Sequence, residues 1–201
     1  MGAGLIVVFL FLTFGRAKSP QTGPTYARFA PAADPSTLAG IQTGPGPWRA
    51  ELAHLRERLG ALGMPAASGA TLHTHEHLDV FVDGNRVTVP ANVGINTNQG
   101  FLGPLHTHDD SGVIHVESQT NSVFTLGEFF DVWGVRFTPT CIGGYCAGGG
   151  KELKVYVDGH LVRGDPQRVE LIAHQEIAVV FGTPAQLPRP IPSSYTFGIG
   201  L

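Results

Sequence analysis

The chain has 201 residues, enough for one domain with short extensions, and 42% of them are hydrophobic, which is enough to build a core. Its formal charge is −3, from 13 Lys and Arg against 16 Asp and Glu, so it lacks the basic surface that nucleic-acid-binding proteins need. Charged residues make up only 14%, whereas Gly (27) and Pro (15) are abundant, as in proteins of short strands joined by tight turns. We therefore expect one mainly β domain and no nucleic-acid partner.

The first predicted element is a hydrophobic segment over residues 1–17, which contains an almost wholly apolar run at residues 3–14. Twelve helical residues rise about 18 Å, short of the roughly 30 Å hydrocarbon core of a bilayer, and this length is typical of a signal peptide. Arg16 and Lys18 follow the run instead of preceding it, which argues against cleavage. We expect residues 3–14 to anchor the chain at the extracytoplasmic (periplasmic) face of a membrane. Secretion after signal cleavage is the alternative.

Residues 18–47 are rich in Pro, Gly, Ala, Thr and Ser and show no sustained apolar period, which predicts a flexible tether. Residues 48–63 then place apolar side chains at helical spacing, which predicts one amphipathic helix. The apolar positions are Trp48, Leu52, Leu55, Leu59 and Leu62. Core packing is the simplest interpretation of this stripe, because charges of both signs occupy the other faces.

Residues 70–201 are predicted to form a β-sandwich domain of the cupredoxin-like or immunoglobulin-like class. Alternating apolar residues predict a hairpin that turns at Asp83–Asn85, and a similar pattern recurs later in the chain, which favours a sandwich. Thr125–Glu128 is a capping box that opens a short inserted helix. Two further strands, predicted at residues 169–172 and 177–181, are expected to pair with each other.

Cys141 and Cys146 are separated by only four residues. In an oxidising compartment so close a pair predicts a small loop-closing disulfide. A metal or redox role would require more cysteines or two-residue spacing, so we expect the pair to be structural.

Six of the nine histidines fall in two short stretches, and the first contains His73, His75 and His77. Alternate residues of a strand share a face, so these three imidazoles are expected to point the same way. The three histidines span about 13 Å along the strand, so only two that are neighbours on this face can bind the same ion. The pattern makes His75 or His77 a candidate metal ligand, with His73 in a supporting position around the ligands.

The second stretch places His106, His108 and His115 on either side of Asp109–Gly112, whose residues are typical of a four-residue hairpin loop. That loop pairs His106 directly with His115, with Cβ atoms about 5 Å apart, and puts His108 on the same face. The intervening side chains then point toward the core: Thr107, Ile114 and Val116. The register therefore predicts three converging imidazoles.

Neutral imidazole is the commonest protein ligand for zinc and copper, and three imidazoles with one open position form a known catalytic or copper arrangement. We predict a copper or zinc site with His106, His108 and His115 as ligands and with Glu117 and Asp109 orienting the rings. A blue-copper site is disfavoured, since it needs a thiolate and both cysteines are distant in sequence. The competing hypothesis is a metal-free polar face, or a pH-sensitive interface.

At these residues the chain resembles a family of uncharacterised bacterial extracytoplasmic proteins. The matching motifs are His-x-His-x-His-Leu-x-x-Phe-Val-x-Gly at residues 73–84 and Leu-His-Thr-His-Asp-x-Ser-Gly-Val-Ile-His-Val-Glu-Ser at residues 105–118. With residues 124–134, the likeness covers roughly residues 70–182. The resemblance implies a cupredoxin-like β-sandwich that binds metal. The chain departs from the family pattern in its long Gly- and Pro-rich tether and at residues 101–104. An alternative is therefore that the metal site of the family serves here only as a structural scaffold.

These features predict a membrane-tethered, non-catalytic module with a histidine metal site, acting as an accessory subunit of a larger membrane complex. One alternative is a purely structural subunit of a respiratory or photosynthetic complex, without metal. Another is a metal-dependent hydrolase with Glu117 as base, which is disfavoured because the sequence offers no group to stabilise an oxyanion.

Overall fold

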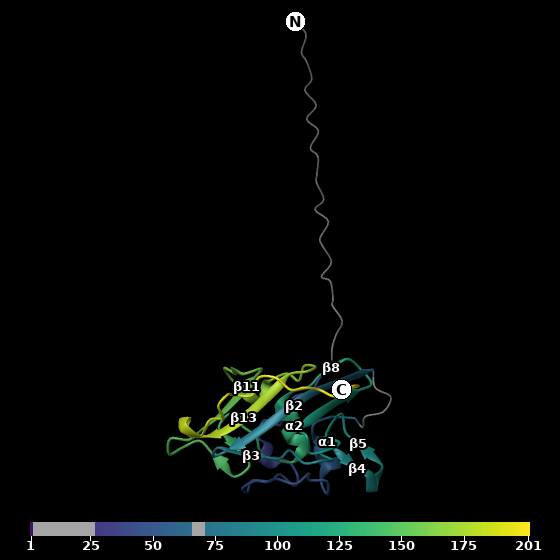
Figure 1. Cartoon of the computed structure of the whole chain (residues 1–201). Coiled ribbons are helices and arrows are strands. Elements are labelled where there is room, and N and C mark those ends of the chain that lie inside the picture. The colour runs from purple at the N-terminus through teal and green to yellow at the C-terminus, as the bar shows by residue number, and fades with distance from the viewer. Residues whose placement is uncertain (2–26, 66–70) are drawn as a thin grey trace.

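Strands dominate the computed structural model, which describes Met1 and residues 27–65 and 71–201 (Figure 1). The elements in chain order are β1 (Ala27–Arg28), α1 (Leu55–Ala61), β2 (Leu72–Val82), β3 (Asn85–Val87), β4 (Ile95–Asn96), β5 (Phe101–Leu102), β6 (Leu105–His106), β7 (Val113–Ser118), β8 (Ser122–Val123), α2 (Leu126–Trp133), β9 (Cys141–Ile142), β10 (Tyr145–Cys146), β11 (Glu152–Val157), β12 (His160–Leu161) and β13 (Glu176–Gly182). The expected mainly β chain with a short inserted helix is confirmed. The predicted anchor at residues 3–14 lies outside the described residues, among which no helix has the length and apolar character to cross a membrane.

One seven-stranded sheet organises the fold: six strands follow the order β12-β11-β13-β2-β7-β6, and the seventh, β3, pairs with β2 beside β7. The first half of β2 pairs with β7 and its second half pairs with β3, while β13 runs parallel to β2 along the other edge. The long strands β2, β13 and β11 lie side by side in Figure 1. The other sheets of the described residues have two strands each: β1 with β8, β4 with β5, and β9 with β10.

The two faces of this sheet are covered by different parts of the chain. One face carries Leu78, Val80 and Val82 of β2 into the main core, where α2 and the small sheets pack. The other face carries a smaller apolar group, Phe81, Tyr156, Ala178 and Val180, covered by Leu187 and Ile191 of the C-terminal segment. That segment, yellow in Figure 1, crosses the sheet, and its Tyr195 stacks on His77 of β2.

Helix α2 begins and ends where its sequence predicts. Thr125 accepts a hydrogen bond from the Glu128 backbone N–H, the Glu128 carboxylate accepts one from the Thr125 N–H, and Gly134 ends the helix at φ 80°. Its aromatic residues are fully buried, as is Asp131. Burial raises the pKa of the Glu128 and Asp131 carboxyls to about 7, and that of Glu76 on β2 likewise.

The predicted helix over residues 48–63 is wrong in its extent, because α1 begins only at Leu55. Residues before it run alongside the end of α2: the Glu51 N–H donates to the Trp133 carbonyl at 3.3 Å, and Trp133 Nε1 donates to the Arg49 carbonyl at 3.1 Å. These backbone groups are therefore unavailable for helical hydrogen bonds. The interpretation of the apolar stripe as core is confirmed, since Trp48, Leu55 and Leu59 are buried.

The described part of the predicted tether, residues 27–47, packs against the domain, so the tether prediction is wrong there. The Ala32 N–H donates to the Asp131 carboxylate at 2.7 Å, and the buried Arg58 guanidinium donates to the Ala39 carbonyl at 2.9 Å. Phe29 stacks on Phe124 with ring centroids 5.2 Å apart. The Pro and Gly residues of this stretch therefore indicate irregular backbone that forms hydrogen bonds with the domain. Residues 18–26 lie outside the described residues.

The expected strand at residues 169–172 is also wrong. Glu170 forms only an isolated bridge with Thr125, and β13 pairs instead with β11 and β2. Both edges of β13 are therefore paired with strands that are distant in sequence, and none is left for residues 169–172.

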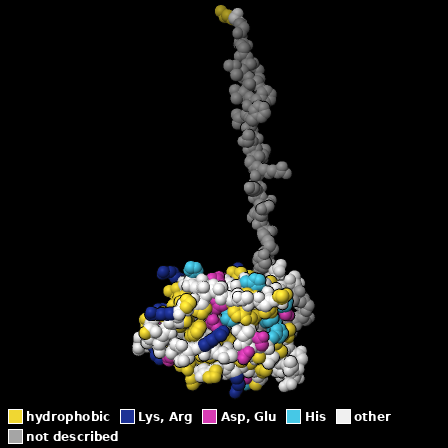
Figure 2. Space-filling view, viewed as in Figure 1, with side chains coloured by type: hydrophobic (Ala, Val, Ile, Leu, Met, Phe, Trp, Pro, Cys, Tyr) yellow, Lys and Arg dark blue, Asp and Glu magenta, His cyan; other side chains and the backbone are white. Residues whose placement is uncertain are grey.

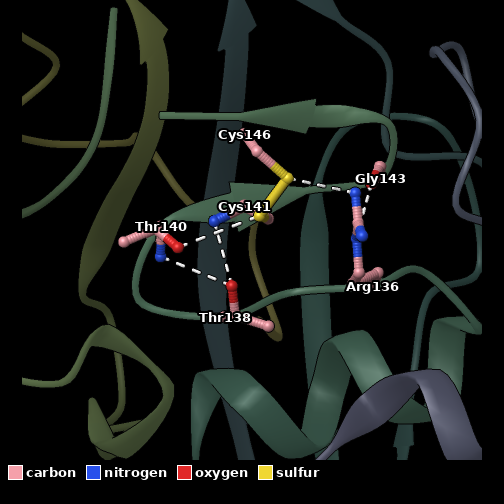
Figure 3. The surroundings of a disulfide bond; sticks show 6 residues. All are labelled: Arg136, Thr138, Thr140, Cys141, Gly143 and Cys146. Atoms are coloured by element: carbon pink, nitrogen blue, oxygen red, sulfur yellow. Dashed lines mark hydrogen bonds between the residues drawn. A yellow bond between two sulfur atoms is a disulfide. The ribbon is translucent and has the colours of Figure 1, made fainter. Parts of the chain in front are cut away.

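Cys141 and Cys146 form the predicted disulfide, which closes the hairpin of β9 and β10 (Figure 3). The Cys141 N–H donates to Thr138 Oγ1 at 3.0 Å, and Arg136 donates to the Gly143 carbonyl at 2.8 Å and to Cys146 Sγ at 3.2 Å. These contacts hold the hairpin against the loop that precedes it.

Replacing both Cys141 and Cys146 by Ser should lower the free energy of unfolding by about 2 kcal/mol, because the open loop gains entropy in the unfolded chain. Urea unfolding of the two proteins measures the difference. Titration of two reactive thiols in the unfolded, unreduced wild-type chain would contradict the bond.

Candidate metal centre

Three adjacent strands each place one histidine in a single row across the sheet. His115 of β7 pairs with His75 of β2 on one side and with His106 of β6 on the other. Directly paired residues share a face and lie about 5 Å apart. The predicted hairpin register is therefore confirmed, with Ile114 and Val116 buried in the main core behind the row.

His73 and His108 extend this row to a group of five, which we call the histidine cluster: His73, His75, His106, His108 and His115. One ring nitrogen from each of His106, His108 and His115 lies within 4.8 Å of the other two, as the sequence predicted. The same holds for His73, His75 and His115. His73 and His108 are exposed and the other three are buried, so the cluster reaches solvent. In Figure 2 several histidine side chains appear at the surface, with carboxylates beside them.

Ring nitrogens without a partner are the most informative feature of this cluster. His75 Nε2, His106 Nε2 and His115 Nδ1 are buried and have no hydrogen-bond partner. Leaving a buried polar atom unpaired costs about 1–3 kcal/mol, and a bound metal ion would provide the missing partner.

The tautomer of His106 is fixed by its other nitrogen. His106 Nδ1 lies 3.0 Å from the Gly103 carbonyl oxygen, which can only accept, so Nδ1 carries the proton. Nε2 therefore presents a lone pair, and this is how histidine ligands are oriented at metal centres.

The buried members of the cluster favour the neutral form that metals require. Burial, with a smaller contribution from the neighbouring imidazoles, lowers the pKa of His106 to about 4 and that of His115 to about 3. Burial also lowers the pKa of His75. At neutral pH no proton has to leave these three rings before an ion binds.

The two predicted orienting carboxylates differ in their positions. Glu117 pairs with His73 across the strands, and its Oε1 lies 3.3 Å from His73 Nε2 and 3.9 Å from His106 Nε2. Asp109 accepts a hydrogen bond from the Ser111 N–H at 2.9 Å and so closes the hairpin loop instead of orienting a ring. The prediction for Asp109 is corrected accordingly.

His77 lies apart from the histidine cluster: one of its ring nitrogens groups within 4.8 Å with Asp79 and Glu176, and with none of the other histidines. Its Nδ1 lies 2.6 Å from a Glu176 carboxylate oxygen, its Nε2 donates to the Ser111 carbonyl at 2.9 Å, and its ring stacks on Tyr195 at 3.8 Å. Both nitrogens are thus used. His73, expected only to support the ligands, stands among the candidate ligands instead.

Two features of the site could not be read from the histidine pattern. The Gly103 carbonyl comes from residues 101–104, just before the second histidine stretch. Gly94 lies behind β6 at φ 70°, where a Cβ would meet the Leu105 carbonyl oxygen at 2.1 Å. A glycine beside a strand is a signal for such close backbone approach, but it does not say which strand approaches.

The cluster offers only imidazole nitrogen at its centre, with a carboxylate at its edge. This donor set suits zinc and copper, which bind imidazole nitrogen at about 2.0–2.1 Å in the case of zinc. Comparisons with protein-family models, with curated proteins and with solved structures give no match. The resemblance stated for the histidine motifs therefore stays a prediction.

The pKa of His106 generates a prediction for the metal-free protein. The unfolded chain protonates this ring near pH 6.5 and the folded chain only near pH 4, so the unfolded state binds more protons in that window and stability falls as pH falls through it. Between pH 7.5 and pH 5 the free energy of unfolding should fall by about 2 kcal/mol more for the wild type than for His106→Gln. Urea unfolding with chelator present measures both. His160→Gln, an exposed position on β12, should follow the wild-type curve. A difference between wild type and His106→Gln that is independent of pH would contradict the assignment.

Proposed function

We propose that this chain is a non-catalytic, extracytoplasmic metal-binding module that holds copper or zinc at His106, His108 and His115. The observation that carries the proposal is that one ring nitrogen of each of these histidines lies within 4.8 Å of the other two, while the buried His106 Nε2 and His115 Nδ1 have no hydrogen-bond partner. His106 Nε2 and His115 Nδ1 are already desolvated by the fold, so binding an ion does not require them to leave water, and His106 Nε2 presents a lone pair because the proton of that ring is on Nδ1. The exposed His108 completes the ligands on the solvent side.

A cupredoxin-like sandwich is part of this proposal. Helix α2 and the two-stranded sheets would take the place of a second large sheet over the core face, and their contributions to the main core support this: Phe129, Phe130 and Trp133 of α2 and Ile142 of β9. The Cys141–Cys146 disulfide supports an oxidising compartment.

Attachment to a membrane through residues 3–14, and service as an accessory subunit of a larger membrane complex, are proposed from the sequence. The apolar character of that run supports them. Recovery of a soluble protein whose mature N-terminus lies at Lys18 would contradict the attachment.

Metal content after equilibrium dialysis tests the proposed site. The wild-type chain, handled without chelators, should bind copper or zinc stoichiometrically, and His106→Ala should weaken binding at least about tenfold, since even residues that only orient ligands contribute that much. His160→Ala is the matched control, because it removes an exposed histidine outside the cluster. Absence of uptake by the wild type, or equal binding by the two variants, would replace the proposal with a structural role for the histidines.

A further inference from the structure

The proposed site uses His106, His108 and His115 and leaves His73 and His75 without a role. Those two rings form a second group with His115, in which one nitrogen from each lies within 4.8 Å of the others. We propose that the histidine cluster holds two metal ions, one on each side of His115, with the His115 ring as a ligand to both. This inference rests on the metal-binding function proposed above.

The ring contacts divide the cluster into two groups. Among the described residues, His73, His75 and His115 contact one another, with centroids 4.5–6.0 Å apart, and so do His106, His108 and His115, at 4.4–5.3 Å. Within the described part of the chain, no ring contact of this kind joins His73 or His75 to His106 or His108, so His115 is the ring that the two groups share.

Strand order explains this division. His115 stands on β7, the middle strand, between β2 and β6. Strands lie about 4.8 Å apart, so His75 and His106 start from backbones separated by roughly 10 Å. His115 is therefore the ring that contacts both His75 and His106, one on each side.

Both groups have the same composition, which is the second observation in favour of two ions. Each contains one exposed ring, His73 or His108, and two buried rings. Each also contains a buried nitrogen without a partner of its own, His75 Nε2 in one group and His106 Nε2 in the other. The reason that makes one group a metal site therefore applies to the other.

Charge balance is available for a second divalent ion. The Glu117 Oε1 atom lies 3.3 Å from His73 Nε2 of the new group and 3.9 Å from His106 Nε2 of the first, so its negative charge is close to both. Ligation of His115 through both ring nitrogens breaks its remaining N–H bond, whose electron pair forms the second metal–nitrogen bond while the proton passes to solvent. The shared imidazolate carries one negative charge between the two ions.

Cu²⁺ binding to the full-length protein tests this inference. Equilibrium dialysis should give two copper ions per wild-type chain, one per chain for His75→Ala or His108→Ala, and none at comparable affinity for His115→Ala. His75→Gln, which keeps a polar side chain of similar size, should also retain one ion and guards against a folding defect. His160→Ala should still bind two.

Electron paramagnetic resonance supplies a readout that a structural role would not change. Two Cu²⁺ ions joined through one imidazolate couple their spins, so the integrated signal of the loaded wild type should fall well below its copper content. Uptake of a single ion at saturation, retention of two ions by His75→Ala, or a signal equal to the copper content would overturn the shared centre. Uptake of no ion would instead contradict the proposed function itself, so the two failures are distinguishable.

Discussion

The pairing of β7 with both β2 and β6 is the constraint on which the histidine cluster depends. It places His75, His115 and His106 in one row on one face of the sheet, and a slip of one residue in either pair would turn a ring to the opposite face. The core fixes the register, because Ile114 and Val116 alternate with His115 and fill the space behind it. The same hydrophobic burial that stabilises the sheet therefore aligns the imidazoles.

The buried rings of the cluster resist protonation and keep ring nitrogens without a hydrogen-bond partner. His106, His115 and His75 are buried with nitrogens unpaired, which disfavours the metal-free fold, and burial lowers the pKa of all three. The main hydrophobic core on the other face of the sheet stabilises the fold against this unfavourable term. Gain of ion–nitrogen bonds would offset the cost, so metal and fold are expected to stabilise each other.

The sequence predicted the local features of this protein and missed those that depend on distant pairing. The His106–His115 hairpin follows from one loop and its alternating side chains, and the capping box at Thr125 from four consecutive residues. The pairing of β2 with β7, which brings His75 to His115, joins strands with no short connection, and no local pattern encodes it. The partner of His77 was missed for the same reason, because Glu176 lies on β13, 99 residues later. Residues 48–54 have helical periodicity, but α2 takes their backbone hydrogen bonds.

X-ray absorption spectroscopy of the metal-loaded protein tests the central claim most directly, because it reports the atoms bound to the ion. The row of paired histidines predicts a shell dominated by nitrogen at about 2.0 Å, with the outer-shell scattering that imidazole rings produce and with no sulfur. An oxygen-only shell without imidazole scattering, or a shell that contains sulfur, would show that the ion binds elsewhere and would contradict the histidine cluster as a metal centre.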